Sequence, residues 1–151
     1  MSDHQDGLLS PMNGSNRDEH RFPRALLDSI GFIELLSSDA LPGSAQVSYE
    51  ARAAFAHSGG TIVQGGFVTA WLDQGMAFAA NARDPDVSVA TLEIKVSFIR
   101  PATPGRHVVH ARVVHWGRSV AFLEAELHDA KGCIARATST AKLRHAAKPA
   151  A

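Results

Sequence analysis

The sequence lacks several features that would mark large classes of protein. It has one cysteine in 151 residues, Cys133, so an internal disulfide is excluded and a reducing compartment is expected. No apolar run reaches the ~18 residues that a membrane-spanning helix needs. The first residues are polar and have neither the basic start nor the apolar core of a signal peptide. These absences predict a cytoplasmic protein without a disulfide framework or a membrane anchor.

The chain also lacks an excess of charge of either sign, with 15 basic and 15 acidic residues. This balance gives no support for a nucleic-acid-binding or membrane-surface protein. The length and the hydrophobic fraction of 45% suit one globular domain with a full core. We expect a disordered N-terminal arm over residues 1–20, a single domain over 21–143 and a frayed tail over 144–151. Deletion of the arm should change the melting temperature little.

The most informative stretch is the apolar segment from Gln64 to Ala80, which predicts one long helix. It begins with Gly65 and Gly66, and its only charged residue is Asp73. At helical spacing the neighbours of Asp73 are mostly small and apolar, whereas the opposite stripe is bulky, so the helix is expected to be buried. A carboxylate there is costly unless it is paired, hydrogen-bonded or near water in a cleft. Asp73 is therefore either a functional group or a structural one that caps or pairs locally.

Alternation of apolar and polar residues predicts strands on both sides of this helix. They cover residues 32–38, 44–52, 87–100, 107–116, 119–128 and 133–143, with a short helix over 21–30 before them. In the long strand after the helix, the predicted dry face holds Ser88, Ala90, Leu92, Ile94, Val96 and Phe98. The predicted polar face holds Thr91, Glu93, Lys95 and Ser97.

Turn signals at 116–119 and 129–132 make hairpins, and they predict that the last four strands form a meander. A single buried helix must lie across the apolar face of one sheet, so the sheet has to curl around it. The predicted fold class is α+β, a hotdog fold in which a curled antiparallel sheet wraps around one long central helix. The edge strands of such a small sheet invite pairing with a second copy.

The start of the helix is a candidate site for an oxyanion. Its first N–H groups have no partner within the helix and lie at the positive end of the dipole, and Gly65 and Gly66 leave them uncovered. The alternative is a tight loop-to-helix join or close packing of helix on sheet. Asp73 lies two turns along on the same side as Gly66, within reach of a ligand held at the helix start. A base beside an oxyanion site is the minimum for hydrolysis of an acyl bond.

Other residue types that carry chemistry form weaker patterns. His107 and His110 have opposite strand parity and do not converge, and only His57, in the loop before the helix, is kept as a candidate for lining the site. No metal-ligand spacing is present, so we expect no metal. The serines lack a nucleophile elbow, and Cys133 is interpreted as a small strand residue rather than a nucleophile.

From Gly60 to Leu143 the sequence resembles the hotdog-fold acyl-CoA thioesterases of the phenylacetate-degradation (PaaI-like) type. The matching segments occur in order and together span more than half of the chain. They are Gln64-Gly65-Gly66, Leu72-Asp73, residues 91–101 (TLEIKVSFIRP) with Gly105, Gly117-Arg118 and residues 129–132 (DAKG).

The resemblance implies that Asp73 is the catalytic carboxylate, as general base or nucleophile, and that the Gly65 N–H polarises the thioester carbonyl. Thr91 falls where some relatives place a Ser or Thr that helps to hold the water, and Ser58 lies near the position of an Asn. Many relatives have His where this chain has Gln64, whose amide can donate a hydrogen bond but cannot transfer a proton. The family is oligomeric, usually a dimer or a dimer of dimers, with active sites between subunits.

These inferences predict hydrolysis of an acyl-CoA, or of an acyl carrier protein conjugate, without a cofactor, since CoA is part of the substrate. The expected substrate contacts are Gly66, Ser58 and His57 around the helix start, Trp71, Met76 and Phe78 along the acyl group, and Arg100, Arg118 and Lys95 at the CoA phosphates. Two alternatives remain: an acyl-CoA-binding hotdog protein without turnover, and a hydratase or dehydratase, which would need a His near the helix. We expect a homodimer, doubled to a homotetramer, that binds neither nucleic acid nor membrane.

Overall fold

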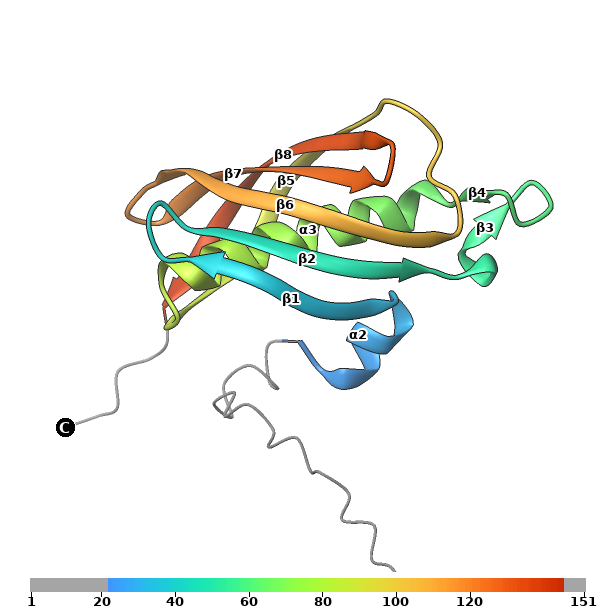
Figure 1. Cartoon of the computed structure of the whole chain (residues 1–151). Coiled ribbons are helices and arrows are strands. Elements are labelled where there is room, and N and C mark those ends of the chain that lie inside the picture. The colour runs from blue at the N-terminus through green and yellow to red at the C-terminus, as the bar shows by residue number, and fades with distance from the viewer. Residues whose placement is uncertain (1–21, 146–151) are drawn as a thin grey trace, which may run out of the picture.

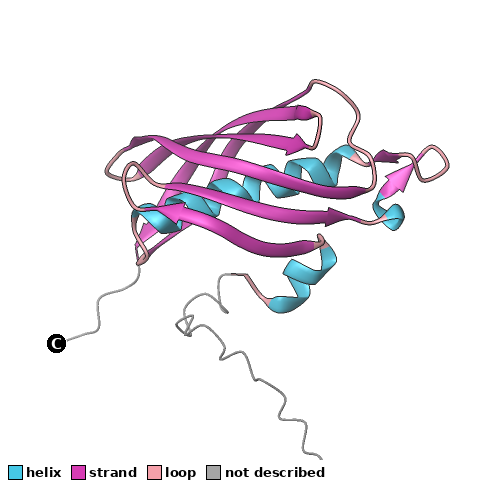
Figure 2. Cartoon of the chain, viewed as in Figure 1, coloured by secondary structure: helices cyan, strands magenta, loops and turns pink. Residues whose placement is uncertain are grey.

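The computed structural model describes residues 22–145, so the predicted N-terminal arm and most of the predicted tail lie outside the described residues. One six-stranded antiparallel sheet, in the order β1-β2-β6-β7-β8-β5, curls around the long helix α3 (Figures 1 and 2). The elements are α2 (Arg24–Ser29), β1 (Phe32–Asp39), β2 (Ser44–Ala51), a 3-10 turn (Ala53–Phe55), β3 (Ala56–His57), β4 (Ile62–Val63), α3 (Gly65–Arg83), β5 (Val87–Phe98), β6 (Gly105–Trp116), β7 (Val120–Asp129) and β8 (Gly132–His145). This architecture confirms the predicted fold class.

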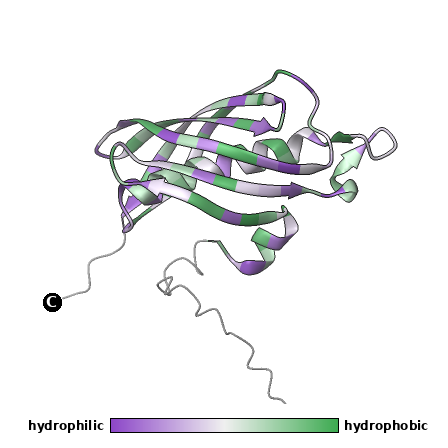
Figure 3. Ribbon diagram, in the orientation of Figure 1, coloured by the Kyte–Doolittle hydropathy of each residue, from purple (hydrophilic) through white to green (hydrophobic). Residues whose placement is uncertain are grey.

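Small side chains let α3 lie close to the sheet. Four alanines, one from each of four neighbouring strands, are in register on the face that meets the helix: Ala45, Ala111, Ala125 and Ala137. On the helix, a Cβ at Gly75 would lie 2.4 Å from Cγ1 of Val109, so only glycine fits there. Apolar and polar residues alternate along the strands (Figure 3), and the inward set packs on α3. No helix in the described range is long and apolar enough to cross a membrane.

An aromatic stack forms the centre of the core. The Trp71 ring is fully buried and lies between Tyr49 and His107, each with a ring-centroid separation of 5.6 Å. The Trp71 indole N–H donates to the carbonyl of Ile30 at 2.7 Å, and the Tyr49 hydroxyl donates to Oε1 of Gln74 at 2.7 Å. Burial raises the pKa of Tyr49 far above its usual value. The indole nitrogen of Trp71 and the hydroxyl of Tyr49 are therefore both hydrogen-bonded, as buried polar groups generally are.

The predicted meander is wrong for the first of its four strands. β6, β7 and β8 are consecutive neighbours, but β5 pairs with β8 at the edge of the sheet, and β6 pairs with β2. The connection from β5 to β6 contains Pro101 and Pro104, which cannot form a tight hairpin ladder. It passes the start of α3 instead, where the carbonyl of the buried Ala102 accepts a hydrogen bond from the Val63 N–H at 2.8 Å.

The predicted dry face of β5 is wrong for the first half of the strand. A bulge shifts the register between Thr91, which pairs with Ala141, and Glu93, which pairs with Thr140. Leu92 is the extra residue and is 61% exposed. Before the bulge the residues that face α3 are Val87, Val89 and Thr91, whereas after it they are Ile94 and Val96, as predicted. A strict period of two would have placed Thr91 on the outer face.

Candidate active site

The start of α3 presents free backbone donors, as the glycines predict. The helix begins at Gly65, with Gln64 as its N-cap residue, and the Gln64 side chain makes no capping hydrogen bond. Among the described residues, no hydrogen bond uses the N–H of Gly65 or Gly66. A Cβ at Gly66 would meet nothing within 4 Å, whereas one at Gly65 would lie 3.2 Å from Cζ of Phe98. The N-terminus is therefore open beside Gly66, and the Phe98 ring borders it beside Gly65.

Asp73 lies on the third turn of α3, half-buried, and is held by one side chain from β5. The Thr91 hydroxyl donates to Oδ1 of Asp73 at 2.6 Å, the length expected of a hydrogen bond to a charged oxygen. Among the described residues, Asp73 forms no ion pair with Lys, Arg or His. It caps no helix and neutralises no cation there, and the Thr91 hydroxyl is the one hydrogen-bond partner of its carboxylate in that range.

β5 links the two parts of this candidate site. Thr91 near its middle touches Asp73, and Phe98 at its end borders Gly65. The two helix positions are eight residues apart, which corresponds to about 12 Å of rise along the helix axis. The site is thus an elongated strip between one side of α3 and the edge strand of the sheet, with a hydrogen-bond donor end and a carboxylate end.

His57 is the last residue of β3 and Ser58 follows it in the turn between β3 and β4, a hairpin that projects from the body near the helix start (Figure 1). Nδ1 of His57 and Oγ of Ser58 are hydrogen-bonded to each other at 2.8 Å, and both residues are exposed. Ser58 has a φ of 52°, a left-handed conformation that this tight turn imposes. In the part of the chain that the structure describes, neither side chain is hydrogen-bonded to Asp73.

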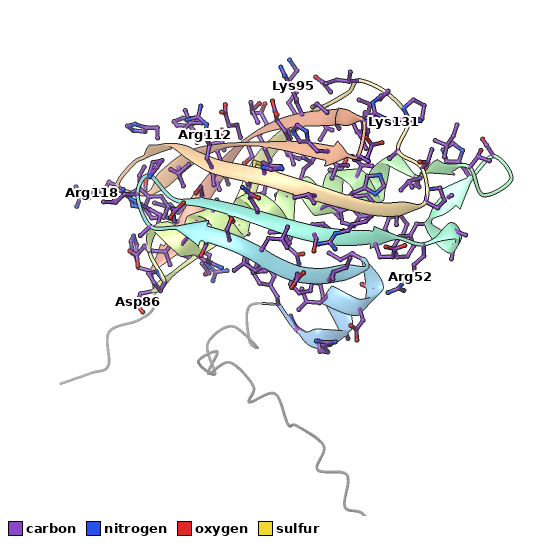
Figure 4. The ribbon with its side chains drawn as sticks, viewed as in Figure 1. Arg52, Asp86, Lys95, Arg112, Arg118 and Lys131 are labelled. Atoms are coloured by element: carbon purple, nitrogen blue, oxygen red, sulfur yellow. The ribbon has the colours of Figure 1, made fainter. Side chains whose placement is uncertain are left out.

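Three of the predicted substrate-binding residues either lie away from the strip or are held by contacts within the protein. Trp71 is fully buried in the aromatic stack. Arg100 makes a two-pronged ion pair with Asp129, with Nη1 donating to Oδ2 at 2.8 Å, and also donates to the carbonyl of Gly132. This pair holds the pKa of Asp129 well below its usual range. Arg118 lies at the end of the sheet opposite Arg52, the residue that precedes the segment leading into α3 (Figure 4).

The described residues also enclose an open groove of about 660 Å³ on the outer face of the sheet, away from α3. Charged side chains of both signs line it, among them Lys95, Arg112, Glu124, Glu126 and Arg136. Lys95 and Arg112 project from the molecule there (Figure 4). Asp73, Thr91 and the two glycines are not part of this groove, so its chemistry is separate from that of the strip along α3.

The sequence matches the thioesterase superfamily over residues 60–134, from the loop before α3 into β8. The chain belongs to this superfamily, and with the long helix α3 inside a curled antiparallel sheet it is a hotdog-fold thioesterase. No curated protein sequence is similar enough to register as a match. The family match covers the helix start, Asp73 and Thr91, which are the residues that form the strip.

Solved structures indicate the type within the superfamily. A phenylacetic acid degradation-related protein from Ralstonia eutropha is 28% identical, with a TM-score of 0.74 over 85% of this chain and 99% of that one. A mutant of the phenylacetic acid degradation protein PaaI from Thermus thermophilus is 28% identical, with a TM-score of 0.68 over 78% and 97%. The E. coli PaaI protein, 19% identical with a TM-score of 0.73 over 84% and 89%, shares the fold. The chain is of the PaaI-like type.

Proposed function

We propose that the protein hydrolyses an acyl-CoA thioester to a free acid and CoA. The observation that carries this proposal is Asp73, a half-buried carboxylate on an apolar helix that is held by one hydroxyl donor and by no cation among the described residues. Its neighbour along the same strip is a helix start with free N–H groups, which suits a developing oxyanion. Membership of the thioesterase superfamily supports the reaction class.

In the proposed reaction, the thioester carbonyl oxygen accepts a hydrogen bond from the Gly65 N–H. Asp73, oriented by Thr91, removes a proton from water as the water oxygen attacks the carbonyl carbon. The tetrahedral oxyanion collapses, the C–S bond breaks, and the CoA sulfur takes the proton from Asp73. Alternatively, the carboxylate itself attacks, releases the CoA thiolate and forms an anhydride that water then hydrolyses. The Gln64 amide can orient the acyl group in either route.

We infer that two subunits complete each site. About 12 Å of helix separates Gly65 from Asp73 in one chain. The oxyanion donor and the base must both lie close to one carbonyl group and its attacking water, so this separation is too long for both to come from the same helix. Within residues 22–145, no strand pairs with the outer edge of β5, which lies next to the strip. An antiparallel β5–β5 contact between two subunits would place their α3 helices side by side in opposite directions. The helix start of one subunit would then approach Asp73 of the other. This supports a homodimer, doubled to a homotetramer.

The test is a hydrolysis screen over short, long and aromatic acyl-CoA esters, with release of the free thiol as the readout. We expect turnover of at least one class after dialysis against EDTA, because the mechanism uses no cofactor. Binding of an ester without hydrolysis of any would favour the second candidate, an acyl-CoA-binding hotdog protein. That candidate is kept because Gln64 replaces the proton-transferring His of many relatives. The proposed location of this reaction is the cytoplasm.

A further inference from the structure

A second cluster of reactive side chains lies on the face of the sheet that points away from α3. Glu126 and His128 on β7 and Cys133 on β8 each offer one donor atom, and these three atoms lie within 4.8 Å of one another. Nε2 of His128 is 2.9 Å from Oε2 of Glu126. All three residues are half-buried. Carboxylate, imidazole and thiolate are the donor groups that bind zinc in proteins.

Strand register creates this cluster, which is why spacing along the sequence predicts no metal. Glu126 and His128 are two apart on β7, so both point outward. The tight turn from Asp129 to Gly132 brings β8 back, and Cys133 pairs directly with His128. On the other side of β7, His110 of β6 pairs with Glu126. The donors thus come from three adjacent strands and not from one local motif.

His110 completes the set of donors. Its ring meets the His128 ring edge-on, with the centroids 4.9 Å apart, so rotation of one side chain can bring a second imidazole nitrogen into the cluster. The result would be one oxygen, two nitrogens and one sulfur. Four donors of this kind suit the tetrahedral coordination of Zn²⁺, and the sulfur disfavours Mg²⁺ and Ca²⁺, which take oxygen ligands.

Arg136 lies beside the cluster and interacts with two of its donors, Glu126 and Cys133, so its guanidinium has to release Cys133 when a cation binds. Its Nε donates to Oε1 of Glu126 at 2.9 Å, which leaves Oε2 directed at His128. Such a hydrogen bond fixes the orientation of a ligating carboxylate. A metal ion that binds here would take the thiol proton from Cys133, as zinc-binding cysteines generally lose theirs.

We propose that Glu126, His128, Cys133 and His110 form a binding site for a divalent transition-metal ion of the zinc class. Tetrahedral Zn²⁺ places its ligand atoms about 3.3 to 3.7 Å apart, given bonds of about 2.0 to 2.3 Å. The donor atoms of Glu126, His128 and Cys133, at 2.9 to 4.8 Å, need only small side-chain rotations to reach this spacing, and His110 has to turn its ring toward them. The ion would tie β6, β7 and β8 together on the outer face, independently of the Asp73 strip, so its role is in stability rather than in hydrolysis.

The experiment is a Co²⁺ titration of the untagged, EDTA-dialysed full chain. We expect about one equivalent to bind with a near-ultraviolet thiolate-to-cobalt charge-transfer band that Zn²⁺ bleaches. Cys133→Ser should abolish the band and weaken Zn²⁺ binding by at least ~10-fold, and His128→Gln should weaken it similarly. Glu124→Gln is the matched control, because Glu124 lies on the same face of β7 but is bonded to Arg112. It should bind like the wild type.

Circular dichroism of every variant tests whether it is folded. If the wild-type protein shows no charge-transfer band with Co²⁺, the proposal is overturned. It is also overturned if Cys133→Ser and His128→Gln bind Zn²⁺ as tightly as the wild type. Zn²⁺ should also raise the melting temperature of the wild type and of Glu124→Gln but not that of Cys133→Ser. Equal shifts in all three would mean that Zn²⁺ binds elsewhere on the surface and would likewise refute the site.

Discussion

Thr91→Val tests whether the contact between β5 and Asp73 serves the reaction. Valine has nearly the shape of threonine and favours strands, so the substitution removes the hydroxyl and little else. The lost interaction is the 2.6 Å hydrogen bond to Oδ1 of Asp73. Thr91 is exposed and Asp73 is half-buried, so water can replace the donor and the protein should stay folded.

The expected size follows from the charge on the acceptor. A hydrogen bond to a charged group contributes about 1.5 to 3 kcal/mol. If that energy orients the carboxylate for the chemical step, its loss lowers kcat by ~10- to ~150-fold, since about 1.4 kcal/mol corresponds to tenfold in rate. KM should change little, because the hydroxyl does not touch the substrate in this mechanism.

Steady-state kinetics on the best acyl-CoA ester measure the effect, beside two further variants. Thr91→Ser restores the hydroxyl and should recover most of kcat. Thr138→Val makes the same exchange on the outer face of β8 and should leave kcat within ~2-fold of wild type, as surface changes usually do. A Thr91→Val enzyme with near-normal kcat, or one that Thr91→Ser does not rescue, would refute the positioning role.

Three further predictions concern the helix start, the core and the assembly. Gly65→Val places a branched side chain against Phe98 at the proposed oxyanion donor. Turnover in ester hydrolysis assays should fall by ~10²-fold or more. Normal kinetics would show that the Gly65 N–H is not the oxyanion donor. Burial lowers the pKa of His107, so as the pH falls through its ordinary value of about 6.5 the unfolded chain takes up this proton more readily than the folded chain. The denaturant midpoint should therefore decrease as the pH is lowered from about 7.5 to about 5.5, and should decrease less in His107→Phe. The same decrease in both proteins would contradict this prediction. Light scattering should give a dimer or a tetramer. When Asp73→Asn and Gly65→Val subunits are co-expressed, their mixed dimers should regain activity, because one of the two sites then combines an intact helix start with an intact Asp73. A stable monomer, or mixed dimers without activity, would contradict sites built between subunits.

Most of the fold could be predicted from local patterns. The helix with its two glycines, the six strands of the main sheet and both hairpin turns lie where periodicity and turn residues place them, within a few residues, whereas the two-residue strands β3 and β4 were predicted as loop. The partner of β5 could not be predicted, because the choice between β6 and β8 depends on how the connection with Pro101 and Pro104 passes α3. That is a long-range contact, and no short window of sequence contains it.

The candidate site shows the same limit at the level of single residues. The sequence singled out Asp73, and the resemblance added Thr91, but strand parity alone placed Thr91 on the wrong face. The bulge at Leu92 brings the two together, and neither Gly nor Pro marks it in the sequence. Phe98 was predicted as part of the apolar face of its strand, but parity alone could not show that its ring borders Gly65 at the helix start. The ion pair of Arg100 with Asp129 likewise required the folded hairpin.

The most direct test of the account is Asp73→Asn, measured for hydrolysis and binding on the same preparation. Asparagine keeps the size of the side chain and an oxygen that can accept the Thr91 hydrogen bond, but it is neither a base nor a nucleophile at neutral pH. We predict that hydrolysis falls by at least ~10²-fold while binding of the CoA ester and the melting temperature are retained. A mutant that melts lower and hydrolyses in proportion to its folded fraction would contradict the catalytic role and make Asp73 a structural residue.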